Sequence, residues 1–194
     1  LEAKECFEEP TDDISPQRNA VVFTYNGIKI ANLHLDGGRY IDKKLTSDFE
    51  IRLAKKLELL RNVIAKNPDI ILGDFNSVYA STQSILEKFI EGQKVYYSPL
   101  QFTNEKQIRR WNSAPYELLK GAGYTYATPS NEENAITNDR GESIIDTIWY
   151  KAGKVDGKDT KIINVLPEYP QKNTYNSNCI ISDHNPVMTT VTKK

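Results

Sequence analysis

The chain has 194 residues, of which 39% are hydrophobic and 26% are charged, and its formal net charge is −1. This balance fits a folded domain with a sizeable core and excludes a disordered or collagen-like chain. Its longest apolar runs fall far short of the roughly 18 residues of a transmembrane helix, so no transmembrane segment is expected. Lysine and arginine are spread along the sequence. A broad basic surface for nucleic acid is therefore not expected, whereas a cleft that grips one or two phosphates remains compatible with the charge.

Neither the cysteines nor the first residues assign a cellular compartment. Cys6 and Cys179 match no metal-binding spacing, and we interpret them as two buried thiols, with one disulfide as the alternative. The chain opens Leu-Glu-Ala-Lys-Glu-Cys, without an initiator methionine or an apolar signal segment. We expect that residue 1 is not the start of the gene product.

The first half of the chain predicts a hairpin followed by a helix. Residues 20–35, AVVFTYNGIKIANLHL, contain two β-favouring runs that meet at Asn26-Gly27, the strongest short turn signal. Residues 47–66, SDFEIRLAKKLELLRNVIAK, predict an amphipathic helix with Ser47 and Glu50 as a capping box. At helical spacing, the expected buried positions are Ile51, Ala54, Leu57 or Leu60, and Ile64.

The second half alternates strands and helices. Residues 70–72 predict a short buried strand that runs into Gly73 and Asp74, and STQSILEKFIEG (81–92) predicts a helix. SAPYELLKGAG (113–123) predicts a short helix capped by Ser113, with Pro115 in its first turn. Three further strands are expected, over GESIIDTIWYK (141–151), KIINVLPE (161–168) and PVMTTVTKK (186–194). The whole predicts a mixed sheet with helices packed outside.

Polar residues interrupt two of the predicted strands. Asn32 and His34 are two apart, so both face away from the apolar side of their strand, although a lone strand histidine is most often structural. Asp74 and Asn76 in GDFN point the same way if the chain is still extended, and a plain turn is the alternative. Both motifs place polar groups at a strand end.

Two more polar interruptions lie near the end of the chain. Asp146 breaks an apolar run, and a carboxylate there needs a partner, which a structural salt bridge or a backbone amide can also supply. The run Ser182-Asp183-His184-Asn185 is either a turn or a site that handles protons. The chain has only two histidines, and each lies in such an interruption.

Four motifs, NLHLDGG, GDFNS, IIDTIWY and SDHNPV, resemble in this order the motif series of the endonuclease/exonuclease/phosphatase superfamily. That group includes deoxyribonuclease I, apurinic endonucleases, neutral sphingomyelinases and inositol-polyphosphate 5-phosphatases. The resemblance runs from about Arg18 to Val191. It implies one domain over residues 1–194 with an α+β fold, a four-layer αββα sandwich with two mixed β-sheets and helices outside.

The resemblance implies a role for each matching residue. Asp74 is expected to orient or deprotonate the attacking water, and Asn76 to hold a phosphate oxygen. His184 is expected to contact the phosphate or act as a general base, next to Asp183, which positions a divalent cation or the histidine. In this view GDFN and SDHN form the centre of one site.

The remaining matches complete the expected site. His34 is expected to contact the phosphate or act as an acid, and Asp146 to support the other histidine or the phosphate site. The metal is expected to be Mg²⁺, with Mn²⁺ or Ca²⁺ as alternatives, held by Asp183 and Asp74. Such a set suits phosphate ester hydrolysis, which needs a hard cation, hydrogen-bond donors and a carboxylate for the incoming water.

Two elements of the family have no match. The family opens with a strand that bears an asparagine and a second strand that ends in Gln-Glu, whose glutamate is the main metal ligand. Residues 1–10, LEAKECFEEP, are acidic but follow no apolar strand, and we interpret them as a solvated segment. We therefore expect a domain that lacks its opening strands, lost or supplied by a second chain, and an isolated chain that is inactive or binds metal weakly.

The function expected from the resemblance is divalent-metal-dependent hydrolysis of a phosphate ester, with a nuclease-like phosphodiesterase as the first choice and nucleic acid among the substrates. A phosphatase or sphingomyelinase type is an alternative, although the Asn-Lys-Gly run typical of the inositol phosphatases is absent. A non-catalytic or partner-completed binding subunit is the other alternative. QIRRWNSAPYELL (107–119) either forms a substrate wall or packs Trp111 and Tyr116 in the core.

Overall fold

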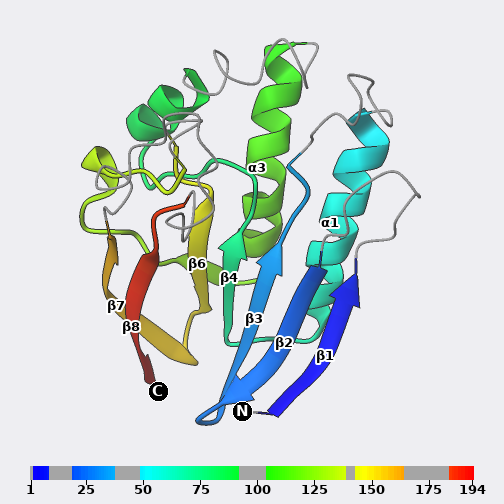
Figure 1. Cartoon of the computed structure of the whole chain (residues 1–194), viewed down its shortest axis with the longest axis vertical. Coiled ribbons are helices and arrows are strands. Elements are labelled where there is room, and N and C mark those ends of the chain that lie inside the picture. The colour runs from blue at the N-terminus through cyan, green and yellow to red at the C-terminus, as the bar shows by residue number, and fades with distance from the viewer. Residues whose placement is uncertain (1, 9–18, 38–48, 92–103, 139–142, 164–183) are drawn as a thin grey trace, which may run out of the picture.

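A six-stranded mixed sheet forms the centre of the fold (Figure 1). The computed structural model describes residues 2–8, 19–37, 49–91, 104–138, 143–163 and 184–194. The strand order is β1-β2-β3-β4-β6-β5, and only β3 and β4 pair in parallel. The strands span β1 (Glu2–Glu8), β2 (Asn19–Tyr25), β3 (Ile28–His34), β4 (Ile70–Asp74), β5 (Tyr124–Tyr126) and β6 (Asp146–Lys151).

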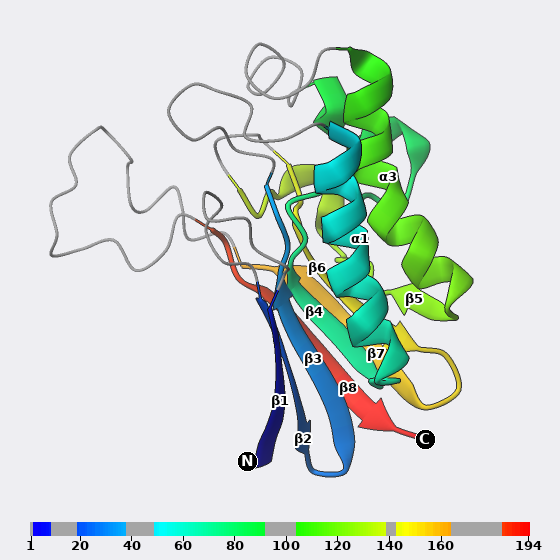
Figure 2. The same ribbon diagram turned by 90° about the vertical axis from the view of Figure 1, so that its right-hand side faces the viewer.

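Two long helices cover one face of this sheet, as Figure 2 shows: α1 (Phe49–Ala65) and α3 (Glu105–Gly121). Their apolar side chains meet those of the strands in the main core, where Leu59, Leu60 and Trp149 have no exposed surface. Residues 83–91 are also helical, which agrees with the helix predicted over 81–92. A short 3₁₀ helix, η1, spans Glu132–Asn134.

A second, smaller sheet lies against the other face of the central sheet. It consists of β7 (Val155–Ile162) and β8 (Val187–Lys193), which pair antiparallel. Val155 packs with Ile70 and Ile148 of the central sheet. Helices, six-stranded sheet and two-stranded sheet therefore follow one another as layers, which confirms the predicted α+β architecture of two sheets with helices outside. In the part of the chain described above, no helix is long and apolar enough to cross a membrane.

One turn and one close contact between strands show why the local sequence matters. Asn26 and Gly27 have φ angles of 49° and 73°, which confirms the predicted hairpin with a two-residue turn. Gly73 has a φ of 133°, and a Cβ there would lie 2.0 Å from the carbonyl oxygen of Leu33. Only glycine permits this approach of β4 to β3.

The buried face of α1 differs from the prediction. Ile51 is 52% exposed and Ala54 is also exposed, whereas Arg52 and Lys56 point inward. The prediction assigned the buried face from apolar residues alone, and it was wrong because the two inward charges have partners at the ends of β3 and β4. Of the predicted buried positions, Leu60 is fully buried.

Helix α3 begins nine residues earlier than predicted. Its N-cap is Asn104, whose side chain accepts a hydrogen bond from the backbone of Gln107 at 3.0 Å. Pro115 lies inside the helix, and the carbonyl it leaves free, that of Trp111, accepts a hydrogen bond from the Ser77 hydroxyl instead. Trp111 and Tyr116 are buried, so they pack in the core and do not form a substrate wall.

Strand boundaries needed three further corrections. Glu2–Glu8, which the sequence did not predict as a strand, form strand β1 and pair antiparallel with β2 of the hairpin. Asp146 begins β6 and does not lie in its middle. The strand predicted over 161–168 is β7, which begins at Val155, and residues 164–168 lie outside the described part, as do Ser47, Asp183 and Cys179. The state of Cys6 and Cys179 stays a prediction.

The register of α1 can be tested with a matched pair of substitutions. Leu59→Ala should lower the free energy of unfolding by about 2–5 kcal/mol, because it leaves a cavity in the main core. Ile51→Ala should change it by no more than about 0.5 kcal/mol, since Ile51 is half exposed. Urea unfolding of both variants measures the difference, and equal losses would contradict the orientation of the helix.

Candidate functional site

Three ionisable residues stand in one row across the central sheet. His34 at the end of β3 pairs in register with Asp74 at the end of β4, and Asp74 pairs with Asp146 at the start of β6. Paired residues on neighbouring strands project from the same face. All three side chains therefore project from the face of the central sheet opposite α1 and α3. On this face Ile30 and Leu72 pack against the apolar cluster that includes Val155 of the small sheet.

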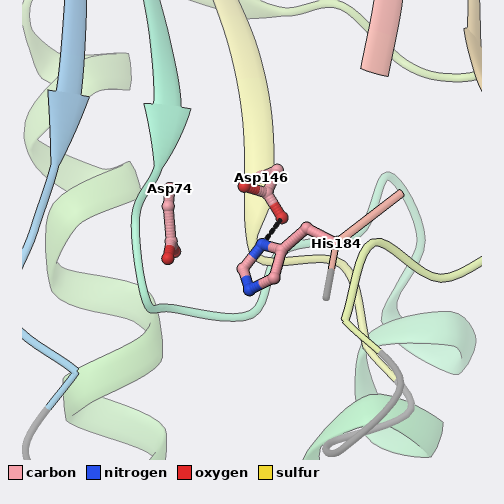
Figure 3. A group of neighbouring side chains, drawn as sticks. All are labelled: Asp74, Asp146 and His184. Carbon is pink, nitrogen blue, oxygen red and sulfur yellow. Dashed lines mark hydrogen bonds and ion pairs between the residues drawn. The ribbon is translucent and has the colours of Figure 1, made fainter. Parts of the chain in front are cut away.

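His184 joins this row from the other sheet. It lies three residues before β8 and forms an isolated bridge with Asn138. Its Nδ1 lies 2.8 Å from Oδ2 of Asp146, the contact drawn in Figure 3. Its Nε2 lies 2.9 Å from the amide nitrogen of Asn138. Both ring nitrogens thus have partners, and the imidazole is held between β6 and the loop that contains Asn138.

Asp74 is held by the turn that follows it. The backbone N–H of Asn76 donates to Oδ1 of Asp74 at 2.7 Å, and the Asn76 side-chain amide donates to Oδ2 at 3.1 Å. Asn76 has a φ of 45°, so the chain has left the extended conformation. Asp74 and Asn76 are brought together, but by a turn and not by an extended strand. The His34 Nε2 lies 3.3 Å from the same Oδ2.

The Asp74 side chain carries the main electrostatic perturbation of the site. Its pKa is raised from 3.8 to about 6, first by burial and second by the negative charge of Asp146. The hydrogen bond from Asn76 and the nearby His184 and Lys56 oppose this shift. Two carboxylates that face each other in a partly buried place disfavour each other's charge.

This group can hold a metal ion. Ligand atoms of Asp74, Asp146 and His184 all lie within 4.8 Å of one another. Two carboxylates and an imidazole suit a divalent cation, and a cation would relieve the repulsion that raises the pKa of Asp74. Mg²⁺ prefers near-octahedral oxygen coordination, so these three side chains form only part of a magnesium site. Asp183, the other expected ligand, lies outside the described residues.

A short loop before β6 holds the site together, and the sequence did not point to it. The Thr137 hydroxyl accepts hydrogen bonds from the backbone N–H groups of Ile145 and Asp146, at 2.9 and 3.1 Å. The Thr137 carbonyl accepts one from Asn185 at 2.9 Å. Thr137 and Asn138 thus join β6 to the residues before β8. Their importance depends on contacts distant in sequence, so no local pattern marks them.

Comparison with known proteins finds solved structures with a similar fold. No family model and no curated protein matches the sequence. A 3'-5' exonuclease, NExo, from Neisseria meningitidis is similar in structure, with 18% sequence identity and a TM-score of 0.54 over 97% of this chain and 71% of that chain. An endonuclease/exonuclease/phosphatase from Beutenbergia cavernae DSM 12333 has 11% identity and a TM-score of 0.50, over 91% of this chain and 39% of that chain.

An endonuclease/exonuclease/phosphatase family protein from Leptotrichia buccalis C-1013-b has 16% identity and a TM-score of 0.46. The match covers 98% of this chain but only 62% of that one. This chain therefore spans less than two thirds of the length of the Leptotrichia protein. At identities this low the similarity concerns the fold, and the chain has the fold of the endonuclease/exonuclease/phosphatase proteins.

Proposed function

We propose that this chain is a member of the endonuclease/exonuclease/phosphatase superfamily and carries most of the active site of a divalent-metal-dependent phosphoesterase. The first choice of reaction is nuclease-like hydrolysis of a phosphodiester by an activated water. One observation carries the proposal: the His184–Asp146 pair lies beside Asp74, where β4 ends and β6 begins. The proposed base, the oriented imidazole of His184 and a partial metal site then lie next to one another.

Asp74 is the proposed base for the attacking water. With a pKa of about 6 in the metal-free chain, the Asp74 carboxylate is ionised at neutral pH, which is the state that can accept a proton. The water oxygen forms a bond to phosphorus as its proton passes to Asp74, and the bond from phosphorus to the leaving oxygen breaks. His34, whose Nε2 lies 3.3 Å from Oδ2 of Asp74, is the proposed phosphate contact or the acid for the leaving oxygen.

His184 is the proposed phosphate contact or second general base, and Asp146 is its partner. The bond from Nδ1 to Asp146 fixes the orientation of the ring. In this structure Nε2 contacts Asn138, so a substrate oxygen that binds Nε2 must share or replace that contact. Asp146 thereby supports a histidine, which is one of the two roles that the resemblance implies.

Asn76 has a positioning role in the structure as it stands. Its amide nitrogen donates to the Leu35 carbonyl at 2.9 Å and to Asp74 at 3.1 Å, so both N–H groups are in use. The amide therefore orients Asp74. Holding a phosphate oxygen, the role implied by the resemblance, requires that one of these two hydrogen bonds be exchanged for the substrate.

The proposed metal is Mg²⁺, with Mn²⁺ or Ca²⁺ as alternatives. Asp74 and Asp183 are its proposed ligands, and Asp146 and His184 line the same place. A divalent cation supplies positive charge to the phosphate oxygens as negative charge builds up in hydrolysis.

The substrate class rests on similarity and stays a proposal. One structure of the Neisseria protein describes it as a 3' phosphatase bound to a product DNA hairpin, with 17% identity and a TM-score of 0.54. That favours nucleic acid over lipid or a small phosphate ester for this chain. A phosphatase or sphingomyelinase type is the alternative enzyme. A non-catalytic binding subunit is the alternative outside catalysis.

We also propose that residues 1–194 form one domain. In this proposal, strands of polypeptide from outside this sequence complete the domain. Val21, Phe23, Ile28 and Ile30 share one face of β2 and β3 and are only partly buried, and Tyr25 on this face is 53% exposed. In the described part of the chain, β7 and β8 each have one edge without a strand partner. Strands added to that small sheet would cover the apolar face and bring the glutamate ligand.

Substitution of His184 tests the catalytic proposal. His184→Gln should lower Mg²⁺-dependent hydrolysis of DNA or of bis(p-nitrophenyl) phosphate by about two to four orders of magnitude, because it removes a proton-transfer group. Lys161→Ala, an exposed change in β7, is the control. The assay uses the chain with any polypeptide that copurifies with it. Absence of hydrolysis in a wild-type sample that does contain a copurified polypeptide would contradict the enzyme proposal and favour the binding subunit.

The raised pKa of Asp74 predicts a pH dependence of stability. Since the folded state binds this proton more tightly than the unfolded state, Asp74 contributes stability below about pH 4. That contribution is lost as the pH rises through about 6. Asp74→Asn should therefore show a smaller fall in unfolding free energy between pH 4 and 7.5 than the wild type. Carboxyl NMR gives the pKa directly, and a value near 4 would contradict the expectation.

The completion proposal predicts the behaviour of the chain alone. The 194-residue chain should bind a hydrophobic dye such as ANS at the β2–β3 face and should bind Mg²⁺ only weakly by calorimetry. Phe23→Lys should reduce dye binding, whereas Ile51→Lys, an exposed change on α1, should not. Tight 1:1 binding of Mg²⁺ with turnover by the chain alone would overturn this proposal.

A further inference from the structure

Lys56 of α1 has its ammonium group completely buried. Its exposed fraction is 0%, although transferring a charge from water into a protein is costly unless hydrogen bonds replace the water. Three hydrogen bonds do so here. Nζ donates to the Asp36 carbonyl at 3.1 Å, the Asn76 carbonyl at 3.0 Å and the Ser77 hydroxyl at 2.7 Å. These bonds match the three donors of an ammonium group.

The three acceptors belong to the two loops that follow the site strands. Asp36 comes two residues after His34, and Asn76 and Ser77 come two and three residues after Asp74. The loops also touch directly, because the Asn76 side chain donates to the Leu35 carbonyl. A Cβ at Gly37 would lie 2.8 Å from the Asn76 Oδ1, so the contact leaves no room for a side chain. Lys56 thus bridges two loops that are 40 residues apart in sequence.

Arg52, one helical turn before Lys56, holds the first loop by its side chain. Its guanidinium contacts both carboxylate oxygens of Asp36, at 2.9 and 3.1 Å, and both residues are buried. Such a two-point pair fixes direction as well as distance. The Asp36 side chain is therefore bound by Arg52 while its carbonyl is bound by Lys56.

Helix α3 holds the second loop from the other side. The Trp111 indole N–H donates to the Asn76 carbonyl at 3.0 Å, and its ring lies 4.2 Å from the Lys56 ammonium. The Tyr116 hydroxyl donates to the Ser77 carbonyl. The loop after Asp74 is thus enclosed by both helices, and Lys56 is the contact that links it to the loop after His34.

We infer that Lys56, supported by Arg52, is a positioning residue. From the helix side of the sheet it binds the loops after β3 and β4, and it thereby sets the spacing between His34 and Asp74. The inference deepens the proposed function and rests on it for its catalytic consequence. An apolar residue in place of Lys56 would leave the two carbonyls and the hydroxyl without this donor. Lys56 does not contact the row of site residues itself, so it acts through the loops.

The test compares Lys56→Met with Lys55→Met, which removes the neighbouring lysine of α1 and leaves the two loops unchanged. In Lys56→Met, hydrogen exchange at the amides of Leu35 and Asn76 should rise by about tenfold or more relative to Ile71 inside β4. In the catalytic assay kcat should fall by roughly 10- to 100-fold with little change in KM, because the reacting groups are displaced and not removed. Lys55→Met should change neither.

If Lys56→Met does not fold, Ser77→Ala replaces it as the test variant, since it removes one acceptor of the Lys56 ammonium. It should raise exchange at Asn76 more than at Leu35. Unchanged exchange in whichever variant folds would overturn the inference, and so would a variant that loosens the loops but keeps the wild-type kcat. If the wild type hydrolyses nothing even with a copurified polypeptide present, the proposed function fails, and the exchange data still decide whether Lys56 holds the loops.

Discussion

The structure depends on the register between three neighbouring strands. Pairing of β3 with β4 and of β4 with β6 puts His34, Asp74 and Asp146 at adjacent positions of one row. A slip of one residue in β4 would turn Asp74 toward the helices and Phe75 toward the site. Gly73 helps to exclude the slip, because only a residue without a Cβ fits so close to the Leu33 carbonyl. The site is therefore a consequence of strand pairing before it is a matter of side-chain chemistry.

The register also creates an electrostatic cost. Asp74 lies beside Asp146 in a partly buried place, and its pKa rises to about 6, first because of burial and second because of the charge of Asp146. Hydrogen bonds from Asn76 and the contact between Asp146 and His184 offset part of the repulsion. The buried ammonium of Lys56 lowers the same pKa from behind the loop. A protein that keeps two facing carboxylates despite this cost has a place suited to a cation.

Much of the fold followed from local sequence. Asn26-Gly27 specified its hairpin, and the apolar run before Gly73 specified its strand, because both signals act within a few residues. The errors came where distant contacts decide. The inward face of α1 holds Arg52 and Lys56, whose partners lie after β3 and β4, and Pro115 lies inside α3 because Ser77 bonds the carbonyl that it leaves free. The candidate site residues could be named from the sequence. The contact of Asn138 with His184 could not be predicted, because it depends on the fold.

The partly buried apolar face and the candidate site lie on the same side of the central sheet. Phe23 and Ile30 pair across β2 and β3, and Ile30 shares its face with His34, four residues further along the strand. Any segment that covers this apolar face therefore lies next to the row of His34, Asp74 and Asp146, on the same side of the sheet. Burial of the face and supply of the remaining metal ligand would then be one event, in which the hydrophobic contact provides the free energy that holds the ligand in place.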